Sequence, residues 1–188
     1  MCIRDRSSAN IEWHVQPLSL DKFGDPLHKF DAITPAVCNL RPSSRGHIHI
    51  VSSQVKRHPA ITLNYLSTDS DRAVAIAGMK YTRKIMNADA LKKFAPEEIE
   101  PGVNCIKDTE LANAAGNLGT TIFHPVGTCK MGNDKMAVVD DRLRVHGIDH
   151  LRVVDASIMP TITSGNTNAP TVMIAEKGAE FILEDAVD

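Results

Sequence analysis

The chain has 188 residues, of which 43% are apolar, 23% charged and 4% aromatic, and its formal net charge is −2. The apolar share is too high and the net charge too small for a disordered chain, and the length allows one domain or two small ones. No stretch approaches the ~20 apolar residues of a membrane-spanning helix, and the charge balance argues against a nucleic-acid partner.

The four cysteines form no Cys-x-x-Cys pair, so we expect free thiols in a reducing compartment and predict a cytoplasmic protein. Residues 1–6 lack the apolar segment of a secretory signal and join abruptly onto the following sequence. We therefore expect residues 1–9 to be an artefact or a truncated end.

The first part of the chain predicts short strands between turns. Residues 11–15 alternate between apolar and polar side chains and predict a strand, and residues 17–46, rich in Pro, Gly and Ser, predict ordered loop. Residues 46–51 place two histidines on one strand face and two isoleucines on the other, and 61–66 predict another extended segment.

Helices are predicted next. Apolar residues recur every three or four positions over 72–87, which predicts a helix capped by Ser67 or Asp69. Residues 88–94 predict a second helix and 109–115 a third, capped by Asp108.

Strands return after residue 120 and a helix closes the chain. The strand-like segments are residues 121–123, 143–146 and 151–154. The helix covers 170–183, because a proline at its first turn is followed by one apolar face. The whole pattern indicates a mixed α and β protein.

Three segments carry residues suited to chemistry. In residues 124–132, a histidine that can accept a proton near neutral pH precedes a proline and a Gly-Thr turn. Residues 151–160 place Asp155 after a strand, a common ligand position in α/β folds. Taken singly, a structural histidine and a turn aspartate are the better interpretations.

The third segment, residues 164–171, is a polar run that leads into the final helix. The first N–H groups of a helix lack internal partners and carry partial positive charge, so this end suits an anion or an electron-rich ring. A capped helix without a ligand explains the same pattern equally well.

In this order the segments His-Pro-Val-Gly-Thr-Cys-Lys-Met-Gly, Leu-Arg-Val-Val-Asp-Ala-Ser and Gly-Asn-Thr-Asn-Ala-Pro-Thr resemble the C-terminal region of the glucose-methanol-choline oxidoreductases. Leu-Arg-Pro-Ser-Ser-Arg-Gly at residues 40–46 and Asn-Tyr-Leu at 64–66 are similar to that family too. The resemblance covers residue 10 to the end and implies an FAD-dependent enzyme that oxidises an alcohol.

The resemblance also implies catalytic residues. His124 matches the family's active-site histidine, and Asn166 falls at the second active-site position, which is His or Asn in different members. These residue types suit the reaction, because a neutral imidazole can take the hydroxyl proton as hydride leaves for flavin N5, and an amide can donate to the developing alkoxide.

The cofactor-binding residues follow from the same resemblance. Asp155 and Ala156 match positions that approach the ribityl and pyrophosphate groups of FAD. Asn168, Ala169 and Pro170 match the segment against the pyrimidine end of the flavin. The helix that begins there would stabilise negative charge on the reduced flavin.

One departure from the family pattern bears on the fold. The chain contains no Gly-x-Gly, the sequence with which the family's N-terminal βαβ unit binds the ADP half of FAD. We therefore expect a C-terminal fragment of a larger two-domain fold that binds FAD poorly alone and has no turnover. Its fold class would be α+β or α/β. Residues 10–139 would form part of a substrate domain with an antiparallel sheet and helices. Residues 140–188 would form the C-terminal strands and helix of a Rossmann-like FAD-binding domain.

Other interpretations remain open at this point. His47 and His49 could bind a metal, although no acidic or cysteine partner has suitable spacing, so no metal is predicted. The basic face formed by Lys80, Arg83 and Lys84 is better explained as a solvated helix face. A hydroxynitrile lyase on the same flavin fold, or a non-catalytic module, would be an alternative to the alcohol oxidoreductase. The alcohol, the electron acceptor (oxygen, or a quinone or dye) and a homo-oligomeric state are not fixed by the sequence.

Overall fold

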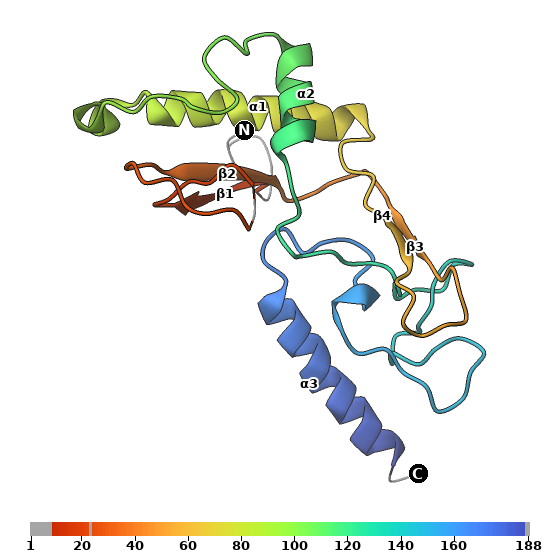
Figure 1. The fold of residues 1–188 in the computed structure, drawn as a ribbon. Helices are drawn as coiled ribbons and strands as arrows, with labels where there is room; N and C mark the ends of the chain where they lie inside the picture. The colour runs from red at the N-terminus through yellow and green to blue at the C-terminus, as the bar shows by residue number, and fades with distance from the viewer. Residues whose placement is uncertain (1–8, 23, 187–188) are drawn as a thin grey trace. The chain divides into compact units, whose positions relative to one another are not determined.

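The computed structural model describes residues 9–22 and 24–186, so Cys2 and most of the segment expected to be an artefact lie outside it. Its strands and helices, in chain order, are β1 (Ile11–Gln16), β2 (Thr34–Asn39), β3 (His47–His49), β4 (Ala60–Thr62), α1 (Asp69–Met86), η2 (Asp89–Phe94), α2 (Asp108–Leu118), η3 (Ala156–Ile158) and α3 (Asn168–Asp185), as Figure 1 shows.

The chain divides into two compact units. One unit contains residues 9–45 and 64–120, and the other contains 46–63 and 121–186. His124 therefore belongs to the same unit as the final helix. The assignment of 10–139 and 140–188 to a substrate domain and an FAD-binding domain stays a prediction.

The first unit is built on an antiparallel pair of strands covered by α1. Strands β1 and β2 pair from Ile11 opposite Asn39 to Gln16 opposite Thr34. The strand predicted at 11–15 is confirmed, whereas β2 lies in the region predicted as loop. Pro35 hid it, since proline is tolerated in a two-stranded sheet where its missing N–H breaks no central ladder. The helix approaches this sheet closely, because a Cβ on Gly78 would lie 2.8 Å from Val37 Cγ2.

Helix α1 begins at a buried carboxylate that also holds the preceding loop. Thr68 caps the helix by accepting the N–H of Asp71, one residue from each predicted cap. The side chain of Asp71 accepts hydrogen bonds from the backbone N–H groups of Ser43 and Ser44 at 2.9 and 2.8 Å and from Asn39 Nδ2 at 3.2 Å. Burial alone would raise the pKa of Asp71, but hydrogen bonds from Ser44 and Ser43 outweigh it and lower the pKa to about 2.

The basic face of α1 makes internal contacts. Arg83 forms a forked pair with Glu98 at 2.9 and 2.7 Å and donates to the carbonyls of Cys105 and Gly102. Lys80 donates to Asp108 at the start of α2. Two of the three basic side chains therefore tie α1 to the 98–108 segment, so the face predicted to be solvated is partly used in internal contacts.

The second unit has its core where α3 meets the preceding segment. The buried core residues are Val139, Leu143, Ile158, Met159 and Ile174. The segments predicted as strands at 143–146 and 151–154 pair only through isolated bridges, Val139 with Val145 and Arg144 with Arg152.

Positive backbone dihedrals explain why these segments are not longer strands. Leu143 and His150 have φ of 65° and 59°, outside the extended region, so each segment bends where a regular ladder would have to continue. Phe123, with φ of 65°, likewise keeps the predicted strand 121–123 irregular. The helix predicted at 170–183 is confirmed as α3, which starts two residues earlier and ends two later. Within the described part of the chain, no helix combines the length and the apolarity needed to cross a bilayer.

We predict that Asp71→Asn destabilises the first unit by about 1–2 kcal/mol at neutral pH. The amide would set its NH2 group against either the Ser43 or the Ser44 N–H, and the partly exposed loop over the site lets solvent screen part of the carboxylate's contribution. Urea unfolding followed by the fluorescence of Trp13, the single tryptophan, measures this unit, because Trp13 Nε1 donates to Thr82 Oγ1 at 2.8 Å.

The folded-state pKa is depressed, so the stabilising contribution is complete above about pH 4 and is lost as the pH falls toward 2. The difference between the wild type and Asp71→Asn should shrink over the same range. Asp69→Asn is the control, because Asp69 is almost fully exposed and pairs only with Arg72, so its loss should cost less than about 1 kcal/mol. An equal cost at both positions would contradict the assignment.

Candidate active site

His124 and Asn166 meet although 42 positions separate them in sequence. The amide Nδ2 of Asn166 lies 3.0 Å from His124 Nε2, the histidine being half-buried and the asparagine exposed. The turn before the histidine is fixed locally, because the Phe123 N–H donates to Thr121 Oγ1 at 3.0 Å. The structure thus brings together the two residues predicted to be catalytic, with an amide donor facing a ring nitrogen.

The first two of the three chemistry-bearing segments run side by side. The N–H of Cys129 donates to Ser157 O at 3.0 Å, and that of Met131 donates to Ile158 O at 2.7 Å. Gly127, with φ of +87°, lies close to Met159, where a Cβ would be 3.3 Å from the carbonyl oxygen. The loop that follows His124 is therefore anchored on the segment around η3.

Asp155 is a cap in this structure. Its carboxylate accepts from the backbone N–H and the hydroxyl of Ser157 at 2.7 and 2.5 Å, and it is the N-cap of η3, which Ala156 opens. The side chain of Asp155 is nevertheless exposed, so capping leaves it accessible. Its predicted contact with FAD stays a prediction.

The start of α3 is open to a ligand. Asn168 and Ala169 are exposed in its first turn, Pro170 is half-buried, and the first turn contains no acidic residue. The N-cap side chain accepts no backbone N–H. These features leave a helix end with unmet donors and partial positive charge, which fits the electron-rich pyrimidine end of a flavin.

The rest of α3 is held firmly against its unit. A Cβ on Gly178 would lie 2.5 Å from Val154 Cγ1, so only glycine permits this separation. At its other end, Arg142 binds both Glu184 and Asp185 at 2.8 and 2.7 Å. Helix α3 therefore approaches its neighbouring segment most closely at Gly178.

Thr167 is a site residue that the sequence analysis missed. Its Oγ1 lies 2.8 Å from His124 Nδ1, and the residue is only 6% exposed. A threonine directly before a helix ordinarily caps it, so the sequence suggested a backbone N–H of the helix as the partner of this hydroxyl. The one sequence feature that could have indicated a site role was its position next to Asn166.

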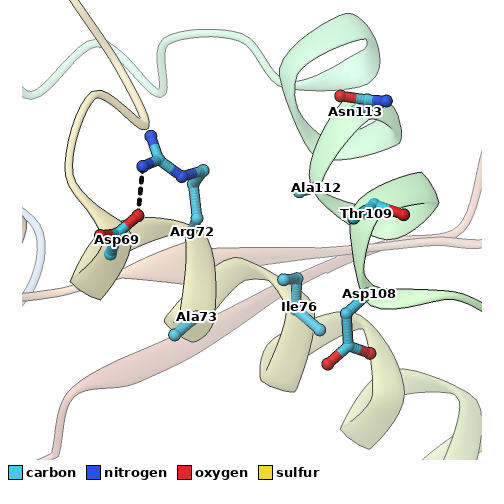
Figure 2. Close-up of a pocket in the computed structure, with 8 residues that line it drawn as sticks. All are labelled: Asp69, Arg72, Ala73, Ile76, Asp108, Thr109, Ala112 and Asn113. Carbon is cyan, nitrogen blue, oxygen red and sulfur yellow. Dashed lines mark hydrogen bonds and ion pairs between the residues drawn. The ribbon is translucent and has the colours of Figure 1, made fainter.

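Two other features do not join this site. The rings of His47 and His49 lie 4.7 Å apart on β3, and no group of three His, Cys, Asp or Glu side chains within residues 9–22 and 24–186 could hold a metal ion. The first unit has a groove of about 360 Å³ between α1 and α2, with the Asp69–Arg72 pair at its edge and Ile76 and Ala112 among its lining residues (Figure 2). No predicted site residue lines it.

Residues 42–175 match the family model described as GMC oxidoreductase, the glucose-methanol-choline family. The match covers most of the chain, so the chain belongs to this family. The predicted family and fold class are thereby confirmed.

The similar proteins are dehydrogenases and oxidases by name. Oxygen-dependent choline dehydrogenases of Citrobacter koseri and Cronobacter sakazakii are each 46% identical over 173 residues, which is 92% of this chain and 31% of theirs. The crystal structure of pyridoxine 4-oxidase from Mesorbium loti superposes with a TM-score of 0.76 at 32% identity, covering 87% of this chain and 31% of that one. A fungal aryl-alcohol oxidase gives 0.71 at 26% identity, covering 80% and 25%.

The chain therefore spans about a third of the length of the relatives it matches. One solved relative is named as an FAD-dependent oxidoreductase from Chaetomium thermophilum. The name of another, a formate oxidase of Aspergillus oryzae, refers to FAD modification. These names agree with the predicted cofactor. None of the relatives named here is a lyase, which favours oxidation over that alternative.

We predict that Gly178→Ala destabilises the second unit by about 1–2 kcal/mol, since the clash with Val154 outweighs the ~1 kcal/mol gain in helix propensity. Hydrogen exchange of the α3 amides, together with urea unfolding followed by circular dichroism, measures the effect. Gly116→Ala in α2 is the matched control, because nothing lies within 4 Å of its added Cβ, and it should be neutral or stabilising. Equal behaviour of the two variants would refute the packing argument.

Proposed function

We propose that this chain supplies the proton acceptor and part of the flavin site of an FAD-dependent enzyme that oxidises the CH–OH group of an alcohol. The contact between His124 and Asn166 carries the proposal, since it puts a ring nitrogen and an amide donor at one point. Their position in the same unit as the open start of α3 supports it.

The two side chains have complementary tasks. His124 Nε2 and Asn166 Nδ2 lie 3.0 Å apart, so a substrate hydroxyl would take the place of the amide at Nε2 and give its proton to that nitrogen. The amide would then donate to the oxygen on which negative charge develops. Because Asn166 is exposed, its amide is free to turn from the imidazole toward the substrate.

FAD, when bound, would supply the acceptor for the hydride that leaves the alcohol carbon. Asn168, Ala169 and Pro170 would lie against its pyrimidine end, and the first N–H groups of α3 would stabilise negative charge there. Asp155 and Ala156 would face its ribityl and pyrophosphate groups. The dinucleotide cradle would come from a region that this chain does not contain.

Choline is the first substrate to test, because the dehydrogenases that are 46% identical to this chain are named for it. The walls that select an alcohol come from several parts of such an enzyme, so similar catalytic residues serve different alcohols. Assays in the presence of oxygen and of a quinone or dye distinguish an oxidase from a dehydrogenase.

We expect His124→Ala to slow anaerobic flavin reduction by about 10²- to 10⁴-fold, the usual contribution of a positioned base, while the flavin content stays unchanged. The measurement is stopped-flow bleaching of the flavin by choline in the complete enzyme that contains this chain.

His58→Ala is the matched control, because His58 is an exposed histidine of the same unit and should not affect the rate. If His124→Ala reduced its flavin as fast as the wild type, the base assignment would be wrong. Cyanohydrin cleavage without any bleaching by alcohols would favour the lyase instead.

A further inference from the structure

We infer that Thr167 holds His124 in the tautomer that carries its proton on Nδ1 and leaves Nε2 free to accept the substrate proton. This inference rests on the proposed function of His124. It makes Thr167 a positioning residue, which acts through the imidazole and touches no reacting atom.

The two neighbours of the ring decide where its proton lies. Nε2 faces the amide Nδ2 of Asn166 at 3.0 Å, and a nitrogen that faces a donor must accept. The threonine hydroxyl can donate or accept, so the amide decides: with Nδ2 facing Nε2, the one N–H group of the neutral ring is on Nδ1. It is donated to Thr167 Oγ1 at 2.8 Å.

A comparison of two helix starts shows that this threonine is not a cap. Thr68, the N-cap of α1, has extended dihedrals (φ −102°, ψ 150°) and accepts the N–H of Asp71. Thr167 occupies the N-cap position of α3, but it has φ −91° and ψ −1° and its side chain accepts no backbone N–H. Helix α3 thus forgoes a cap of about 1 kcal/mol, and the hydroxyl goes to the histidine instead.

The hydroxyl is also shielded and fixed in place. Thr167 is 6% exposed, so little water can compete for Nδ1. Its carbonyl accepts the N–H and the hydroxyl of Thr171 at 3.0 and 2.6 Å, which ties it to the first turn of α3. The orientation of the imidazole is therefore set by the same helix end that is proposed to face the flavin.

The tautomer matters because imidazole in water prefers the proton on the nitrogen remote from the backbone, which is Nε2. In that form Nε2 could not accept from an alcohol. With the proton on Nδ1, the hydroxyl proton passes to Nε2, the O–H bond breaks as the N–H bond forms, and the resulting imidazolium keeps its bond to Oγ1. No proton moves to the threonine.

The test uses the complete flavin-loaded enzyme with nitrogen-labelled histidine. Nitrogen NMR of the His124 ring, assigned with His124→Ala, should show protonation on Nδ1 in the wild type. Thr167→Val should shift the ring toward the Nε2–H form and slow flavin reduction about 10- to 100-fold, part of the 10²- to 10⁴-fold contribution of a base. Thr167→Ser, which keeps the hydroxyl, should restore both.

Thr163→Val is the control, because Thr163 is an exposed threonine of the same unit, and it should leave the ring tautomer unchanged. Because Thr167 does not cap α3, the valine variant removes no capping bond, and circular dichroism should show unchanged helix content. If the valine variant did not fold, Thr167→Ala, which also removes the hydroxyl, would take its place in the same comparison.

A wild-type ring protonated on Nε2, or no shift in Thr167→Val, would overturn the inference. A clear shift with an unchanged reduction rate would support the role of Thr167 in tautomer choice and show that this choice does not control the rate, whereas His124→Ala tests separately whether His124 takes part in the reaction. The failure of the inference and the failure of the proposed function are thus separable.

Discussion

The candidate site depends on the packing of α3 against residues 139–159. At Gly178 the helix lies so close to Val154 that a single methyl group would collide, and this contact fixes the helix axis against the segment that also holds the loop after His124. A histidine and an asparagine 42 positions apart can face each other only if both supports are fixed in this way. The side-chain geometry is therefore a consequence of the packing behind it.

Amphipathic helices were the part of the fold that the sequence predicted best, because their period is repeated over many residues. Both α1 and α3 lie where the apolar spacing placed them. Strands were harder to predict: β2 was hidden by Pro35, and residues 143–146 make only bridges because Leu143 takes a positive φ. No local sequence pattern predicts a positive φ at a leucine, because this conformation is imposed by the packing around it.

The site residues differed in how well the sequence predicted them. His124 and Asn166 stood out through the family resemblance, and the structure adds that they lie in hydrogen-bonding distance. Asp155 illustrates how two interpretations of one residue can coexist, because it caps η3 and still leaves its side chain exposed. Thr167 was hidden by the very rule that usually explains a threonine before a helix, since only three-dimensional contacts show that its hydroxyl bonds a ring 43 positions away.

The starts of α1 and α3 differ in their capping: α1 has a side-chain cap and α3 lacks one. In the first unit, Thr68 accepts a backbone N–H of the helix and Asp71 accepts two N–H groups of the preceding loop, so the start of α1 is held by hydrogen bonds. In the second unit, the start of α3 is left without a side-chain cap, its N–H groups stay open, and the threonine serves the histidine. Local rules broken in this way are expected at functional sites. Under the proposed function, one helix end would do two things at once: its open donors would favour negative charge on the electron acceptor, and the hydroxyl of Thr167 would set the proton-accepting nitrogen of His124.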